Sequence, residues 1–376
     1  MKKHFPLLFV VLLLICLMST MLAAPAYADG SVSINKTNFP DETFRQYVKE
    51  TWDKDGDNVL SADEITAAQS INLSENDTWK NGIASLDGIQ YFTNLRYLVA
   101  DAMPNISGAL DFSNNRELRS IKMSNIVFVN GQGQNVGGKL SSVTLGNLPK
   151  LRELNLTNQY VIKSIDVSQC PAIENLSLGG TSISTLDVSK NKNLAFLACN
   201  HTFLSELNVS NNTQLFGLNV FSIKVPFTLT LGNQENLRAL AAQYSHMDNL
   251  DISGCPILLG LLKEEYYTDQ GDYHSYETAP GNDGSRIFYD KHVLLQTEKN
   301  QVFTTLTLPA ALTRIEEDAF AGTVADTVVL PENCVSVRSG AFANCPKLQI
   351  VYASAAAVFD EHAFDGCGHV FISRTE

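Results

Sequence analysis

The chain has 376 residues and a formal net charge of −13, with 40 acidic and 27 basic side chains. An acidic chain without a basic stripe argues against nucleic acid as a partner, because nothing would neutralise the phosphates. The length would ordinarily indicate two or three globular domains, but a solenoid grows in one dimension and escapes that size limit.

Residues 1–28 have the features of a secretory signal peptide. Two lysines precede an apolar run, and Ala26 and Ala28 supply the small residues expected before a cleavage site. A transmembrane anchor is the competing interpretation, but the run is short and the small-residue site follows it directly. We therefore expect an extracellular protein, secreted or held non-covalently at the cell surface, without a transmembrane anchor after cleavage.

The segment 29–80 contains a stretch that matches the calcium-binding loop of an EF-hand. Its spacing of oxygen-bearing groups suits a hard cation with six to eight ligands. The predicted ligands are Asp53, Asp55, Asp57, the backbone carbonyl of Val59, Ser61 and Glu64. Ca²⁺ is therefore the expected cofactor.

The residues around this loop predict two short helices. Phe44, Tyr47 and Val48 share one face of an entering helix, while Ser61 and Glu64 have the capping-box spacing of an exiting one. Asn58 stands where the loop normally has Gly, and Asn also tolerates the left-handed conformation needed there. The alternative is an acidic helical cap without metal. Because this hand has no second copy, we expect it to close the apolar end of a solenoid and not to act as a calcium switch.

Residues 81–262 repeat a short phrase every 21 or 22 residues. Leucines two and three apart are followed by Asp-Val-Ser or a near copy, and then by Asn or Cys. No single copy can bury so many apolar side chains, so neighbouring copies must stack. One longer step contains a Gly-rich insertion at Gly131–Gly138, which predicts a loop bulging from one repeat.

A polar column runs through these copies. It comprises Asn115, Leu148, Cys170, Asn191, Asn212, Gln234 and Cys255. We expect its amides and thiols to be buried at a tight turn and to bond backbone groups of the adjacent coil. The copies at Leu186–Leu194 and Leu207–Leu215 carry a resemblance to bacterial leucine-rich repeat proteins.

Cysteine usage has two interpretations. Six cysteines lie beyond the signal segment, an even number that would suggest disulfides in an exported chain. However, Cys170, Cys255 and Cys345 occupy equivalent turn positions before proline, which favours buried thiols in place of Asn. No Cys-x-x-Cys pair points to zinc.

The segment 263–300 falls out of repeat phase and is rich in tyrosine. The residues that stand out are Tyr266, Tyr267, Tyr273 and Tyr276. Tyrosine supplies rigid amphipathic contact surface, so a recognition loop is one interpretation. An ordered insertion or linker whose tyrosines pack onto the last coil is the other.

Residues 301–376 contain a second type of repeat. The pair Ala-Phe returns at Phe320, Phe342 and Phe364. Together with the flanking residues Thr313–Gly322, this resembles the surface-antigen or BspA-like leucine-rich repeat of bacterial and protist adhesins. We therefore expect an α+β repeat protein, a leucine-rich repeat solenoid of short parallel β-strands with a small helical cap that is EF-hand-like.

The face that a ligand would meet follows from the phrase Leu-x-x-Leu-x-Leu. Residues that flank the middle leucine of each strand alternate outward. The candidate ligand-binding residues are Tyr97, Glu153, Asn155, Asn175, Ser177, Phe196, Asn219 and Phe221. This surface is small, polar and nearly uncharged, and it lacks the dense aromatic track that a polysaccharide would need, so a protein partner is slightly favoured over a glycan. A face that is merely solvated is the alternative.

No combination of residues argues for an active site. The repeated Asp166, Asp187 and Asp251 recur once per coil and so belong to the architecture. The leading hypothesis is a monomeric, internalin-like or adhesin-like binding protein. The alternatives are a structural protein of the cell envelope, and a hydrolase or an inhibitor of one.

Overall fold

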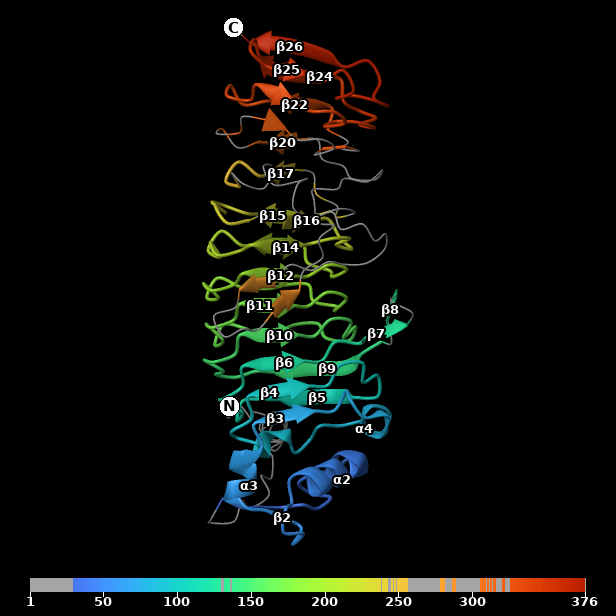
Figure 1. The fold of residues 1–376 in the computed structure, drawn as a ribbon, viewed down its shortest axis with the longest axis vertical. Coiled ribbons are helices and arrows are strands. Elements are labelled where there is room, and N and C mark those ends of the chain that lie inside the picture. Colours follow the sequence, from blue (N-terminus) through green and yellow to red (C-terminus); the bar gives the residue numbers. More distant parts are fainter. Residues whose placement is uncertain are drawn as a thin grey trace, which may run out of the picture.

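The computed structural model describes residues 30–129, 132–135 and 137–237, most of 239–255, short strands at 278–280 and 286–288, parts of 305–321, and residues 325–375. The expected signal segment and the four tyrosines Tyr266, Tyr267, Tyr273 and Tyr276 lie outside the described residues. The described part is an elongated stack of coils with helices at its N-terminal end (Figure 1).

Eight parallel strands form the longest sheet, here called the front sheet. In spatial order they are β3 (Ser70–Asn72), β4 (Tyr97–Val99), β6 (Ser120–Lys122), β10 (Glu153–Asn155), β11 (Asn175–Ser177), β12 (Phe196–Ala198), β14 (Gly217–Asn219) and β16 (Ala239–Ala241). The strands follow chain order, and Leu154 lies opposite Leu176, one coil further along. The predicted leucine-rich repeat solenoid is confirmed.

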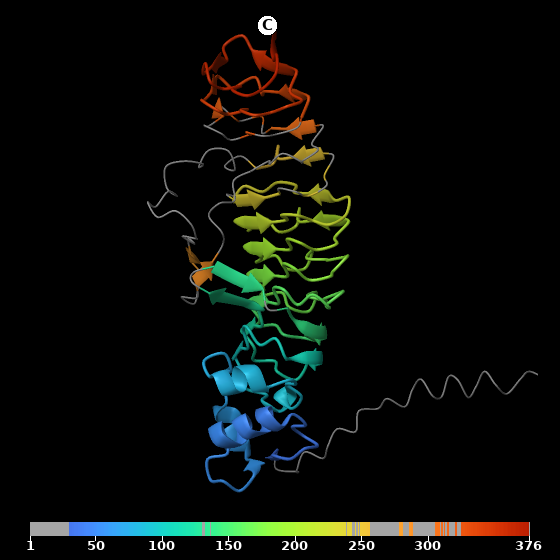
Figure 2. The same cartoon turned by 90° about the vertical axis from the view of Figure 1, so that its right-hand side faces the viewer.

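A second row of parallel strands, here called the rear row, lies on the opposite side of the coils (Figure 2). It is broken into pairs and one triplet. The members are β5 (Ser107–Asp111) with β9 (Lys139–Thr144), β13 (Glu206–Asn208) with β15 (Thr228–Thr230), β17 (Asn249–Asp251) with β20 (Thr305–Thr307), and β22 (Thr327–Val329) with β24 (Ile350–Ser354) and β26 (Phe371–Thr375).

The pairing of β17 with β20 joins the two repeat types into one stack. Leu250 lies opposite Leu306, as Leu207 lies opposite Leu229 in an uninterrupted pair. The long intervening segment is thus an insertion between consecutive rungs of the rear row. Within it, β18 (Thr278–Pro280) and β19 (Arg286–Phe288) form an antiparallel ribbon.

The C-terminal coils continue on both sides. A further parallel triplet consists of β21 (Arg314–Ile315), β23 (Ser336–Val337) and β25 (Val358–Phe359). Inside these coils, Phe342 stacks between Phe320 and Phe364, with ring centroids 5.5 and 5.8 Å apart. The repeated phenylalanine is therefore a core residue that sets the fit between coils.

The predicted polar column forms a buried ladder. Nδ2 of Asn191 donates to the carbonyls of Val167 and Cys170 in the preceding coil, at 3.1 and 2.8 Å. Nδ2 of Asn212 repeats the pattern one coil on, towards Val188 and Asn191. These bonds satisfy carbonyls that the tight turn would otherwise leave unpaired inside the core.

The Gly-rich insertion emerges as predicted from a single repeat. Its strands are β7 (Ile126–Val129) and β8 (Gln132–Asn135), an antiparallel hairpin between the front strand β6 and the rear strand β9. The register of β5 with β9 is retained apart from one irregularity after Gly108. The extra residues are therefore accommodated outside the stack.

The N-terminal cap contains three helices, α2 (Glu42–Thr51), α3 (Ala62–Ala67) and α4 (Asp77–Gly82), and one 3-10 turn, η1 (Ile89–Tyr91). As predicted, α2 buries Phe44, Tyr47 and Val48. Phe39 then contacts Phe92 of the first coil, with ring centroids 6.3 Å apart. The cap and the coils share one hydrophobic cluster, and the front sheet already begins within the cap segment, at β3.

Asp41 fastens the cap to the first coil. Its Oδ1 accepts from the N–H of Phe44 and so caps α2, while Oδ2 accepts from the N–H groups of Ala84 and Ser85. One carboxylate thus caps the N-terminus of α2 and positions the helix against the solenoid.

Among the described residues, no helix has both the length and the apolar character needed to cross a bilayer.

Candidate recognition face and candidate metal loop

The front sheet brings the predicted ligand residues onto one surface. Glu153, Asn175 and Phe196 stand side by side on β10, β11 and β12, and Asn155 and Ser177 form a second column beside them. Tyr97, on β4 at the N-terminal end, is exposed. The predicted residues of the strands therefore gather on one face.

Asn175 is less accessible than predicted. Only 9% of it is exposed, and its Oδ1 atom is buried without a hydrogen-bond partner. The prediction treated every outward position of the sheet as solvent-facing, but a short polar side chain between larger neighbours is covered by them. Asn175 thus belongs to the floor of the face.

Two other asparagines on this face have a structural task. Oδ1 of Asn155 accepts from the N–H of Thr157, and Oδ1 of Asn219 accepts from the N–H of Phe221, both at 3.0 Å. These bonds turn the chain at the end of each strand. The side-chain amide N–H groups are then the donors that each asparagine can offer to a partner.

Phe196 and Gly217 form an apolar spot in the middle of the sheet. A Cβ atom built on Gly217 would lie 2.9 Å from the Phe196 ring, closer than normal packing allows. Gly217 therefore makes room for the ring of Phe196 to lie across β14. The half-buried ring is a rigid contact surface of the kind that interfaces favour.

Phe221 lies at the edge of the face, where the strands end. Its ring meets the ring of His201 edge-on, with centroids 5.1 Å apart. Burial and the nearby Lys224 lower the pKa of His201, so the imidazole is neutral at physiological pH. This edge therefore combines two aromatic rings with the nearby cation of Lys224.

A column that the sequence analysis did not consider runs beside the predicted one. The phrase Leu-x-x-Leu-x-Leu has two variable residues before its middle leucine, and the alternation of a strand predicts only the second to point outward. The first places Arg96, Arg119, Arg152 and Glu174 on successive coils, all half-buried. The phrase itself contained this signal, since both positions vary in chemical type between copies while the flanking positions stay leucine or isoleucine.

Ion pairs occupy part of this region. Lys122 lies 3.2 Å from Glu153, which also accepts from the hydroxyl of Ser120, and Lys150 lies 2.6 Å from Glu117. Oε1 of Glu174 is 3.8 Å from Nε of Arg152. The N-terminal half of the face is thus charged, in contrast to the nearly uncharged surface predicted.

The rear row contains a shallow hollow of about 700 Å³ where two coils lack a strand. Asp166 and Asp187 line it, and each accepts from the N–H of the serine two residues on, at 2.8 Å. Hydrogen bonds from those serines hold the pKa of both carboxyls below the usual range. Asp251 makes the same turn with Ser253. The repeated aspartates are turn-forming residues, as predicted.

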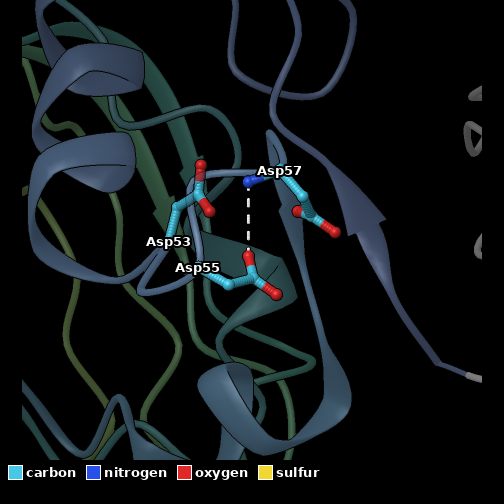
Figure 3. Close-up of side chains that lie close together, drawn as sticks. All are labelled: Asp53, Asp55 and Asp57. Carbon is cyan, nitrogen blue, oxygen red and sulfur yellow. Dashed lines mark hydrogen bonds between the residues drawn. The ribbon is translucent and has the colours of Figure 1, made fainter.

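The candidate metal loop holds three carboxylates together (Figure 3). Ligand oxygens of Asp53, Asp55 and Asp57 all lie within 4.8 Å of one another. Backbone N–H groups orient them. Oδ1 of Asp53 accepts from Gly56, Oδ1 of Asp55 accepts from Asp57, and Oδ1 of Asp57 accepts from Val59.

Asn58 adopts the left-handed conformation predicted for it, with φ of 63°. Its N–H donates to Oδ2 of Asp53 at 3.1 Å, so the turn places an amide against the innermost carboxylate. Val59 then enters β2 (Val59–Leu60), which pairs with β1 (Val32–Ser33). The short strand β2 of this single EF-hand-like loop is therefore paired with β1 of the N-terminal segment.

Glu64 closes the loop from its far end. Oε1 accepts from the N–H of Lys54 at 2.6 Å, and Oε2 accepts from both the N–H and the hydroxyl of Ser61. Ser61 and Glu64 form the predicted capping box of α3. Burial alone would raise the pKa of Glu64, but the hydrogen bonds from Lys54 and Ser61 outweigh it and lower the pKa.

This arrangement fits a hard cation at the three aspartates. Asp53 is buried, and no ion pair joins any of the three carboxylates to a basic side chain within the described ranges. Glu64 stands outside the three-carboxylate group and is occupied by hydrogen bonds. The oxygen donors suit calcium. Glu64 would become a ligand only if its carboxylate gave up its present hydrogen bonds to Lys54 and Ser61.

Buried thiols replace asparagine in part of the ladder. Sγ of Cys345 donates to the carbonyl of Phe320 at 3.2 Å, across one coil. Burial raises the pKa of Cys170 to about 11 and those of Cys199 and Cys255 to about 12. These thiols stay protonated at neutral pH and act as core residues.

The C-terminal coils match a known family. Residues 298–371 match the model of the BspA type leucine-rich repeat region, which confirms the type of repeat expected there. No curated protein matches the chain significantly.

Solved structures of leucine-rich repeat proteins are similar at low identity. Internalin C2 from Listeria monocytogenes has 17% identity and a TM-score of 0.41, over 62% of this chain and 96% of that one. Another internalin from Listeria monocytogenes, inlF, has 14% identity and a TM-score of 0.34, over 91% and 97%. A leucine-rich cell surface protein from Faecalibacterium prausnitzii has 12% identity and a TM-score of 0.28, over 76% and 78%. At these values the similarity carries no information on function.

Proposed function

We propose that this chain is an exported binding protein that recognises another protein through its front sheet. The observation that carries the proposal is the front face itself, an array of parallel strands whose outward side chains differ from coil to coil while the buried middle residue stays leucine or isoleucine. A repeating scaffold with a variable face is suited to binding, because the face changes without disturbing the core.

The front face has the composition of a protein interface. Phe196 supplies a rigid apolar centre, Tyr97 an exposed aromatic ring, and Asn155 and Ser177 nearby polar groups. Aromatic anchors surrounded by polar groups are the usual arrangement of a binding hot spot. Adhesion at the cell exterior is the setting that the expected signal segment and the surface-antigen type of repeat support.

The cap, in this proposal, binds Ca²⁺ for stability. Asp53, Asp55 and Asp57 would hold the ion, with the Val59 carbonyl, Ser61 and Glu64 completing the set. A bound cation would offset the mutual repulsion of the three carboxylates and fix α3 relative to α2. Its role is to keep the apolar end of the solenoid covered, so that the front face remains ordered.

The test compares variants of the two sides of the solenoid against an array of purified extracellular protein domains. Phe196→Ser removes the apolar centre of the front face, and Thr228→Ser makes a mild change on the rear row as a matched control. We expect wild type and the rear variant to bind the same target, and the front variant to bind at least about tenfold more weakly. Equal binding by both variants would show that the front sheet is not the site.

A further inference from the structure

Two arginines on the edge of the front sheet form no ion pair within the described residues, although both lie close enough to Glu117 to lower its pKa. Arg96 and Arg119 precede the strands β4 and β6, which are neighbours in the sheet because Tyr97 lies opposite Ser120. Adjacent parallel strands are about 4.8 Å apart, so two like charges stand on neighbouring rungs. Nε of each arginine is buried and has no hydrogen-bond partner.

The acids nearby are already engaged. Glu117 accepts two hydrogen bonds from Lys150, at 2.6 and 2.7 Å, and Glu153 is held by Lys122 and Ser120. Among the described residues, no ion pair includes Arg96 or Arg119. After the pairs are formed, these two guanidinium groups are the excess positive charge on this part of the face.

Partially buried, unpaired guanidinium groups are costly in a folded protein. An unsatisfied donor of a charged group costs more than a neutral one, and like charges on adjacent strands repel. The chain as a whole carries a net charge of −13, so this positive spot is set in an acidic molecule. An external anion at the remaining guanidinium nitrogens would relieve the repulsion between the two charges.

We propose that Arg96 and Arg119 bind two carboxylates of an acidic segment on the protein partner. The guanidinium group is planar and pairs with a carboxylate through two parallel hydrogen bonds, which fixes orientation as well as charge. Tyr97 lies immediately beside Arg96 and exposes its ring, so the same segment would meet an aromatic surface. This inference rests on the proposed function and names the partner chemistry of its N-terminal half.

An acidic protein segment fits better than an anionic polymer. A polymer such as nucleic acid gains affinity by neutralising many phosphates, and only two unpaired guanidinium groups are present in this column. The acidic remainder of the molecule would also repel a long polyanion, whereas it would orient a short acidic segment towards these two arginines.

The experiment measures binding of a fluorescent peptide that contains a run of glutamates, beside a matched peptide with glutamines. Wild type should bind the glutamate peptide at low ionic strength and lose affinity as salt is added. The double variant Arg96→Gln/Arg119→Gln should bind at least about tenfold more weakly. Arg338→Gln, which removes one positive charge at an exposed position in the C-terminal coils, should leave binding unchanged.

The variant Arg96→Lys/Arg119→Lys separates charge from geometry. Lysine keeps the charge without the planar fork, so we expect binding between wild type and the glutamine variant. Thermal melting checks that each variant is folded.

Three results would overturn the inference. These are no binding of the glutamate peptide by folded wild type, equal loss in Arg338→Gln, or arginine-dependent binding of heparin or single-stranded DNA that is tighter than that of the peptide. If Phe196→Ser loses the array target while the arginine variant retains it, recognition by the front sheet stands and only the acidic segment is refuted.

Discussion

Asn191 illustrates how single residues hold this solenoid together. Its side-chain nitrogen bridges two carbonyls of the preceding coil, and its backbone carbonyl accepts from Asn212 in the next one. Its Oδ1 is buried without a hydrogen-bond partner, so each asparagine of the ladder leaves one acceptor unsatisfied while its Nδ2 satisfies two backbone carbonyls. Asparagine is therefore more favourable here than an apolar residue, which would leave both carbonyls without a donor.

Replacing Asn191 with Ala should destabilise the protein by about 2–3 kcal/mol, because two buried carbonyls would lose their donor. The matched control is Asn193→Ala, an exposed residue whose amide makes one weak bond of 3.4 Å to Pro171. We expect the control to change the unfolding free energy by less than about 0.5 kcal/mol in chemical denaturation. Equal effects would mean that the ladder bonds do not stabilise the coils.

Thiol reactivity should follow burial. At pH 8 we expect alkylating reagents to label the half-buried Cys367 first, and the buried Cys199 and Cys255 only after unfolding, as read by mass spectrometry. The pKa of Cys199 rises from 9.0 to about 12 on folding. Its contribution to stability is therefore fully present below about pH 9 and is lost as the pH rises through about 12. Rapid labelling of Cys199 in the native protein would contradict this.

The residue scale also separates what sequence patterns predict from what they miss. Asn58 and the Ser61–Glu64 capping box are local, because each depends on backbone geometry within a few residues, and both were predicted correctly. The burial of Asn175 and the unsatisfied Nε of Arg96 depend on side chains from neighbouring coils. The repeat period predicts the register between those coils, but it does not predict which side chains of one coil cover residues of the next.

At the scale of elements, the cap depends on contacts between segments that are distant in sequence. The strand β1 pairs with β2 inside the metal loop, and Asp41 joins α2 to the first coil. The helices followed from amphipathic spacing, whereas β1 is too short to leave a periodic signal. Calcium binding would act on this same junction, since the loop connects α2 to α3 through β2.

Calcium should stabilise the chain without its signal segment. At about a hundredfold excess over the dissociation constant, a single site adds about 2.7 kcal/mol, seen as a higher melting temperature than in chelator. Glu64→Gln should abolish the increase, because it removes a charged ligand while Gln still serves a capping box.

The control for the calcium experiment is Asp63→Asn, an exposed acid in the first turn of α3. It should retain the full calcium response, since it is not among the predicted ligands. If chelation leaves the melting temperature of wild type unchanged after bound metal has been removed, the loop is a plain acidic cap.

At the scale of the whole molecule, stacking order is the main determinant of shape. Repeat phase alone predicted the solenoid, because each coil contacts only its neighbours and the period sets the register. The direct pairing of β17 with β20 was not foreseeable, since the intervening segment has no phase. The rear row was not foreseeable either, since the coil of Asp166 has no rear strand whereas that of Asn208 has β13.

Deletion of residues 265–298 should leave the stack intact. It would bring the spacing from Leu250 to Leu306 to that of a regular coil, such as Leu154 to Leu176. We expect one cooperative unfolding transition and an unchanged far-UV circular dichroism spectrum per residue of the solenoid. Two separate transitions would show that the repeat types on either side fold as independent units.

The central claim is that partners bind on the front sheet, and site-specific photo-crosslinking tests it most directly. A photoreactive phenylalanine analogue at Phe196 reports on the front sheet, and the same group at the exposed Thr185 reports on the rear side. We predict crosslinks to the partner found on the array from position 196 and none from position 185. Crosslinks from position 185 alone would place recognition on the rear side and contradict the account.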